Sequence, residues 1–123
     1  MDHATRVDAL LAELTRGEGF LGAALVSRDG LCVRSAGRTE LSRETFSAMS
    51  ATVMGAAEIA LRELDGGATR SIVASTEKVL IVVVGATREM LLVASARTDA
   101  ALPAVIARVE EAAKGVGKVL AGG

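Results

Sequence analysis

The sequence predicts an α/β fold, more narrowly an α+β sandwich, in which helices cover both faces of a five-stranded antiparallel sheet. The main observation is the apolar run 79–84, which reads Val-Leu-Ile-Val-Val-Val and ends at Gly85. Successive side chains of a strand point to opposite faces, so a strand without polar positions must be covered on both faces. Residues 20–27 form a second run of this kind. Around these runs lie segments whose apolar residues recur at helical spacing.

Length and composition limit the classes of protein that fit. The 123 residues suffice for a single domain, 1–123, with its own hydrophobic core. The net charge is −1, with acidic and basic residues interspersed, so we expect neither nucleic acid nor a membrane surface as a partner. Cys32 is the only cysteine, and no signal peptide is recognisable. We therefore expect a cytoplasmic protein without disulfides.

The first helix is predicted over residues 4–16, with Thr5 as a possible N-cap and Gly17 as the stop. Two strands follow, at 20–27 and 31–36. The turn between them reads Arg-Asp-Gly, which is typical of a hairpin, so these two strands should pair antiparallel. The helix should bury a single stripe made of Val7, Leu10, Leu11 and Leu14.

The second helix should begin at Ser42, which can act as its N-cap, and run to about Asp65. Leu41 and Phe46 have the spacing of a hydrophobic staple at its start, and a pair of glycines, 66–67, follows its end. We assign one apolar stripe of this helix to the sheet. The stripe consists of Phe46, Met49, Val53, Ala57, Ala60 and Leu64.

Three more strands are predicted at 69–75, 79–84 and 89–96, joined by turns of about three residues. A last helix begins near Leu102, with Pro103 in its first turn, where proline is tolerated. Two glycines in the last part of this helix leave its end undetermined, and its buried stripe should be Leu102, Val105, Ile106, Val109, Ala113 and Val116.

The strand order follows from which strands carry polar residues. The second and third strands do, so they should form the edges of the sheet. With one hairpin and one three-stranded meander, the predicted order is 2-1-5-4-3. The long second helix must then cross one face of the sheet, and the other two helices must cover the other face.

The far side of the second helix predicts self-association. Ser47, Ala51 and Gly55 recur there at intervals of four residues, and such small side chains let another helix approach closely. The alternative is that these residues are tolerated on a solvent-facing surface. The third strand is an unguarded edge, which invites pairing. A two-fold dimer would satisfy both surfaces. Its predicted interface consists of Ser47, Ala51, Met54, Gly55, Arg70, Ile72 and Ala74.

The predicted element order and the hairpin at 22–31, Gly-Ala-Ala-Leu-Val-Ser-Arg-Asp-Gly-Leu, resemble the Roadblock/dynein light chain family, especially its prokaryotic MglB-like branch. Related profilin-like and longin-like folds share parts of the pattern. The resemblance implies homodimers whose paired second helices form a platform for small Ras-like GTPases. Some members stimulate GTP hydrolysis and others act as scaffolds. It implies no catalytic residue and no cofactor, so we expect a protein that is not an enzyme.

On that reading, charged side chains around the second helix would form the GTPase-binding surface. Arg38 is the only arginine that lies in a loop before this helix, so it is the one candidate for an arginine inserted into the GTPase. Because arginines are few, we expect that any stimulation works by holding the switch loops of the GTPase. The predicted surface consists of Arg38, Arg43, Glu44, Glu58 and Arg62.

Other chemistry finds little support in the sequence. Residues 17–22 match G-x-G-x-x-G but follow a helix and open a strand, the reverse of the phosphate-binding context. Residues 115–118 resemble the end of a P-loop, yet Val119 stands where a Mg²⁺-binding Ser or Thr is required. His3 and Cys32 assemble no metal site or nucleophile. The alternative function is a small-molecule sensor of PAS or GAF type, but the short turns leave little room for a pocket.

Overall fold

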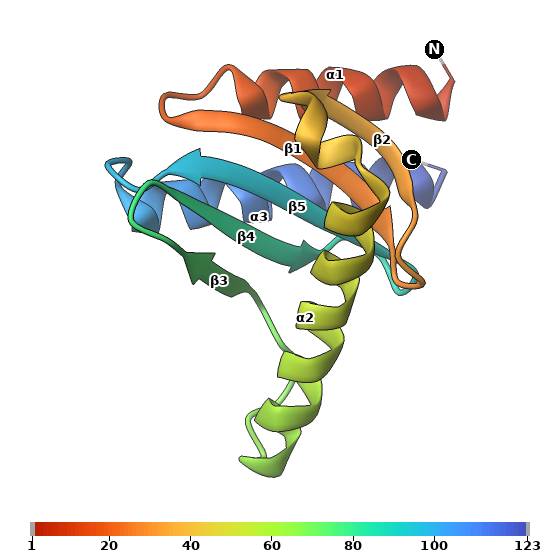
Figure 1. The fold of residues 1–123 in the computed structure, drawn as a ribbon. Helices are drawn as coiled ribbons and strands as arrows, with labels where there is room; N and C mark the ends of the chain where they lie inside the picture. Colours follow the sequence, from red (N-terminus) through yellow and green to blue (C-terminus); the bar gives the residue numbers. More distant parts are fainter. Residues whose placement is uncertain (1, 123) are drawn as a thin grey trace.

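The computed structural model describes residues 2–122 and contains three α-helices, one short 3₁₀ helix and five strands within that range (Figure 1). The elements in chain order are α1 (His3–Thr15), β1 (Phe20–Ser27), β2 (Cys32–Gly37), the 3₁₀ helix η1 (Thr39–Ser42), α2 (Glu44–Glu63), β3 (Ile72–Ser75), β4 (Val79–Gly85), β5 (Met90–Arg97) and α3 (Leu102–Leu120).

The five strands form one sheet with the order β2-β1-β5-β4-β3, and every neighbouring pair is antiparallel. The predicted topology is therefore confirmed. In the centre of the sheet, Val83 of β4 lies opposite Val93 of β5 and Ile72 of β3. The most apolar strands occupy the interior because each of their faces is covered, whereas β2 and β3 carry the polar positions and lie at the edges.

Two helical layers enclose the sheet: α1 and α3 cover one face and α2 lies on the other (Figure 1). The side chains of β4 point alternately to the two faces. Leu80, Val82 and Val84 belong to the core under α1 and α3, whereas Val83 belongs to the core under α2. Val82 and Val83 are both fully buried. Burying one such side chain contributes about 1.5–3 kcal/mol, so both faces are needed to stabilise this strand.

Helix α2 packs on the sheet with its first part, as far as Met54, and its last turns project beyond the sheet (Figure 1). An ion pair 2.7 Å long joins Arg28 Nη1, in the turn after β1, to Glu58 Oε1 in the second half of α2. The sequence predicted a helix crossing the sheet from edge to edge. Instead, α2 leaves the sheet, and residues 64–71 return the chain to β3.

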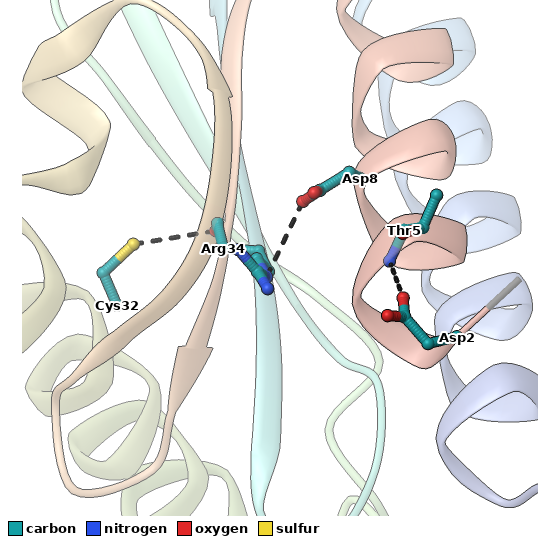
Figure 2. A network of polar contacts seen from close by, with 5 residues as sticks. All are labelled: Asp2, Thr5, Asp8, Cys32 and Arg34. Carbon is teal, nitrogen blue, oxygen red and sulfur yellow. Dashed lines mark hydrogen bonds and ion pairs between the residues drawn. The ribbon is translucent and has the colours of Figure 1, made fainter.

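The helix starts differ from the prediction. Asp2, not Thr5, caps α1: its Oδ1 accepts a hydrogen bond from the backbone N–H of Thr5 at 2.8 Å (Figure 2). This bond holds the pKa of Asp2 below its ordinary value. Ser42 does not cap α2 either, because it lies in η1 and its hydroxyl donates to the carbonyl of Thr39 at 2.8 Å. Arg43 occupies the N-cap position of α2 without a side-chain hydrogen bond.

Helix α3 continues through both of its glycines to Leu120, so the undetermined end is now fixed. Each glycine lies at a close approach. A Cβ at Gly117 would be 2.7 Å from the carbonyl oxygen of Ala86, and a Cβ at Gly115 would be 3.3 Å from a methyl group of Leu10. The glycines thus let α3 pack against the β4–β5 turn and against α1. Among the described residues, no helix has both the length and the apolar character needed to cross a bilayer.

Candidate interaction surface

The structure reverses the predicted orientation of α2. Ser47, Ser50 and Met54 face the sheet and are buried, at 0%, 3% and 1% exposure. Met49 and Val53, which the sequence analysis assigned to the sheet, are 54% and 37% exposed. The assignment of Met49 and Val53 to the sheet is therefore wrong, whereas Phe46 packs against the core under α2 as predicted. The position of the helix on the sheet face opposite α1 and α3 is confirmed.

The reason is that the small side chains of Ser47 and Ser50 let α2 approach the sheet closely, with Met54 filling the core beside them. The hairpin tip between β1 and β2 also reaches the helix, where a Cβ on Gly30 would lie 3.1 Å from the Cα of Ala48. The hydroxyl of Ser47 is buried and has no hydrogen-bond partner. A buried hydroxyl without a partner costs free energy, and the close packing around it must offset that cost.

Several large apolar side chains of α2 are exposed and form a row along the helix. Five apolar residues at i, i+4, i+7, i+11 and i+15 share one side of the helix, and all are exposed. Leu64, at the end of this row, is 77% exposed. We call this row the outer seam; it consists of Met49, Val53, Ala56, Ala60 and Leu64.

The half of α2 that extends past the sheet is apolar on more than one side. Ile59 is 60% exposed, and it lies on the flank of the outer seam. Leu61, on another side of the helix, is half-buried. Glu58, Arg62 and Glu63 occupy the rest of its circumference. The exposed apolar residues between them have no cover among residues 2–122, which marks this half of α2 as an interaction surface.

Strand β3 supplies an open sheet edge on the other side of the chain. It pairs with β4 along one side only. Val73 is 37% exposed and Ala74 is exposed, whereas Ile72 packs against the core under α2. Arg70, just before the strand, forms an exposed ion pair with Glu110 of α3 at 3.3 Å.

The predicted dimer residues fall into different environments. Ser47 and Met54 lie inside this chain's own core, so they are not available to a second chain and that part of the prediction is corrected. Ala51 is half-buried against the core under α2. Gly55 is half-buried, and a Cβ there would meet nothing within 4 Å. Ala74 and Arg70 are exposed.

The predicted GTPase-binding residues form two groups. Arg38, Arg43 and Glu44 lie at the start of α2, and Glu58 and Arg62 lie in its second half. Glu44 and Glu58 are fourteen positions apart, which is about 21 Å along a helix. A single chain therefore does not bring all five residues together.

Arg38 is held by a neighbour. Its guanidinium donates a hydrogen bond to Glu40 of η1, and its backbone N–H donates to the carbonyl of Leu21 at 3.1 Å. The hydrogen bond from Arg38 lowers the pKa of the Glu40 carboxyl, and the same bond raises the pKa of Arg38. Arg38 is thus an ordered, paired side chain.

Arg28 is a residue that the sequence analysis missed. Its ion pair with Glu58 joins two segments thirty positions apart, and no local pattern in the sequence signals such a pair. Because this ion pair occupies Glu58 within the chain, Glu58 contributes less free charge to the predicted binding surface than its exposure on a helix suggests.

Cys32 joins a small network of polar contacts on β2. The thiol of Cys32 donates to the carbonyl of Arg34 at 3.6 Å, and the Arg34 side chain is 3.8 Å from Asp8 of α1 (Figure 2). This chain of contacts ties β2 to α1. Across residues 2–122, no group of three His, Cys, Asp or Glu side chains is placed to hold a metal ion.

A sheet of this order, enclosed by one long helix on one face and two helices on the other, is the profilin-like Roadblock fold. The sequence model of the Roadblock/LC7 domain matches residues 6–96. The chain belongs to the Roadblock/LC7 domain family. No curated protein matches the sequence significantly.

Solved structures share the fold at low sequence identity. A Roadblock/LC7 domain from Streptomyces avermitilis is 24% identical, with a TM-score of 0.84 over 93% of this chain and 97% of that one. MglB from Myxococcus xanthus is 16% identical, with a TM-score of 0.88 over 99% of this chain and 92% of that one. Acanthamoeba castellanii profilin II is 18% identical, with a TM-score of 0.65 over 95% of this chain and 98% of that one. The predicted MglB-like Roadblock fold is confirmed.

Proposed function

We propose that this protein is a homodimeric regulator or scaffold, not an enzyme, and that it binds a small Ras-like GTPase. The observation that carries the proposal is the outer seam of α2, which is apolar and exposed and has no partner within the chain. Exposed apolar surface of this kind marks protein interaction sites. The seam therefore replaces the small-residue stripe as the proposed contact between two chains.

A two-fold axis perpendicular to α2 would pair the two outer seams antiparallel. Each chain would then cover the projecting half of its partner's helix, which includes Ile59 and Leu64. The open edge of β3 is the second surface that two chains could share, and Val73 and Ala74 lie on it.

This pairing would also leave the charged residues on the outer surface of the helix pair. The start of α2 in one chain would lie beside the second half of α2 in the other, with Glu44 and Arg62 on the sides of the helices that are turned away from the seam. Charged groups around an apolar centre set the orientation and the rate of association more than the affinity. We propose that the GTPase docks there.

If hydrolysis is stimulated, the mechanism we favour is stabilisation of the switch loops of the GTPase. Arginines near α2 are few, and Arg43 and Arg62 lie at the N-cap and within a regular helix, not on a reaching loop, which supports this. We propose no cofactor, and we place the protein in the cytoplasm, where small GTPases act. The sensor alternative gains no support from the structure, since apolar side chains fill both faces of the sheet.

Light scattering of two matched variants tests the dimer. Ala60 lies on the outer seam and Ala107 lies on α3, and both are exposed alanines within helices. Ala60→Arg would bury an unpaired charge and should give monomers, whereas Ala107→Arg should keep the mass of the parent, expected at twice 12.6 kDa. A parent that is monomeric at micromolar concentration, or an unchanged Ala60→Arg dimer, would contradict the proposal.

The GTPase is tested by titrating the purified protein with each small Ras-like GTPase of the source organism in its GTP-bound and GDP-bound forms. Single-turnover hydrolysis is then measured with saturating Arg38→Ala, Arg43→Ala and Arg62→Ala variants. We expect losses that follow binding. A fall of about 10³-fold or more with binding intact would show an inserted catalytic arginine. If none of the GTPases binds, the proposal that this protein is a GTPase regulator or scaffold is wrong.

A further inference from the structure

A groove lies between α1 and α3, on the side of the molecule away from α2. Two hollows follow one another along this helix pair, with volumes of about 330 Å³ and about 380 Å³. They share four lining residues, so they form one continuous groove. The shared residues are Leu10, Glu13, Gly115 and Lys118.

The groove runs along two antiparallel helices. Leu14 of α1 lines the first hollow together with Arg108 of α3, whereas Arg6 lines the second hollow together with Val119. The floor is apolar, because α1 and α3 meet closely where Gly115 faces Leu10. The floor consists of Leu10, Leu14, Ala112, Gly115 and Val119.

The rim of the groove is positively charged, although the whole chain has a net charge of −1. Four cations and two carboxylates line it. Within residues 2–122, none of the four cations has a carboxylate at ion-pair distance, whereas Glu13 pairs with Arg16 at 3.8 Å. The charged lining residues are Arg6, Glu13, Arg108, Glu111, Lys114 and Lys118.

Two further acidic groups of these helices are paired with other elements and do not neutralise the rim. Asp8 of α1 pairs with Arg34 of β2, and Glu110 of α3 pairs with Arg70 before β3. Arg108 is stacked over the ring of Phe20, with its guanidinium carbon 5.8 Å from the ring centre, so it is positioned without a carboxylate. The groove therefore has an electrostatic preference for an acidic occupant.

The walls of the groove also determine the shape of the occupant. Both walls are sides of helices, whose backbone groups are bonded within the helices. An extended peptide would find no backbone partners there and would leave its own N–H and C=O groups unpaired against an apolar floor. A helix satisfies its own backbone and presents an apolar stripe, so it fits this groove.

We propose that the α1–α3 groove docks an acidic amphipathic helix of a partner protein. This site is independent of the outer seam of α2 and lies on the opposite face of the sheet. A dimer with a GTPase on its α2 platform would thus carry two further docking sites, one on each chain, and would hold a second kind of partner.

The test is a selection of displayed peptides on the full chain. Each peptide has eighteen residues, with Leu and Ala fixed along one helical stripe and Glu, Gln or Lys allowed elsewhere. We expect the enriched peptides to be rich in Glu and to shift the backbone amide resonances of residues 6–14 and 108–119. No enrichment, enrichment of Lys-rich peptides, or shifts confined to α2 would overturn the proposal.

Variants on the rim make the test quantitative. The double variant Lys114→Glu with Lys118→Glu reverses two exposed charges and should weaken binding of an enriched peptide about tenfold. The matched control is Lys78→Glu, an exposed lysine in the turn between β3 and β4, and it should leave binding unchanged. Equal affinity in all three proteins would overturn the proposal. Binding to phosphatidylserine vesicles that the double variant abolishes would also overturn it, because the groove would then recognise a membrane surface.

Discussion

Replacing two glycines within helices by alanine should have opposite effects on the free energy of unfolding. Alanine is favoured over glycine in a helix interior by about 1 kcal/mol. At Gly55 of α2 the new Cβ meets nothing within 4 Å, so Gly55→Ala should stabilise the protein by that amount. At Gly117 of α3 the same Cβ would lie 2.7 Å from the carbonyl oxygen of Ala86.

That carbonyl belongs to the β4–β5 turn, which is held by a hydrogen bond from the N–H of Ala86 to the carbonyl of Met90 at 2.9 Å. Relieving the contact requires a movement of the turn or of α3, and overpacking of this kind costs about 1–3 kcal/mol. Since the helix preference is the same in both variants, Gly117→Ala should be less stable than Gly55→Ala by about 1–3 kcal/mol. This difference isolates the cost of the contact.

Urea unfolding followed by circular dichroism, at one fixed protein concentration, measures the difference. A change of 1 kcal/mol also moves the melting temperature by about 4 °C in a chain of this length. Equal stabilisation of both variants would show that α3 does not approach the turn as described. If Gly55→Ala instead dissociates the dimer, Gly55 lies at the interface, as the sequence predicted, and the outer seam is not the contact.

Three further outcomes are expected. Met54→Ala should destabilise the protein by about 2–5 kcal/mol in urea unfolding, because Met54 is 1% exposed and its removal leaves a cavity under α2; a loss below 1 kcal/mol would contradict this packing. The pKa of Glu40, measured by NMR titration, should lie below the ordinary value of a glutamate and should rise in the variant Arg38→Ala. The ion pair therefore stabilises the fold at pH values above the ordinary pKa of a glutamate. This stabilisation is lost as the pH falls through the lowered pKa of Glu40. Glu58→Gln should break the ion pair with Arg28, cost about 0.2–1 kcal/mol, and speed amide exchange in the last turns of α2.

The sheet could be predicted from the sequence because its signals are local and strong. The uninterrupted apolar run of β4 requires cover on both faces, and the polar residues of β2 and β3 place those strands at the edges. The boundaries of β1 are those predicted, Phe20–Ser27. Strand β3 is shorter than predicted, since residues 69–71 lie outside the sheet and only Ile72–Ser75 pair with β4.

The orientation of α2 could not be predicted because both sides of this helix lack charge near its middle. Large apolar residues on one side and small ones on the other are compatible with two arrangements. The usual assumption is that Met49 and Val53 face the core. Here Ser47, Ser50 and Met54 face the sheet, so Met49 and Val53 are left for another surface. The ion pair of Arg28 with Glu58 depends on this orientation, so it could not be predicted from the sequence either.

The order of the projecting half of α2 should depend on the concentration of the protein. The five residues of α2 beyond Glu58 extend from an anchored helix but have little packing of their own, so a covering surface should reduce fraying of this end. If the seams pair as proposed, dilution dissociates the dimer and uncovers this segment. Its helix content should therefore fall as the protein is diluted. A cell could then control how many dimers present an ordered α2 platform by changing the rates of synthesis and degradation of the protein, without modifying the chain.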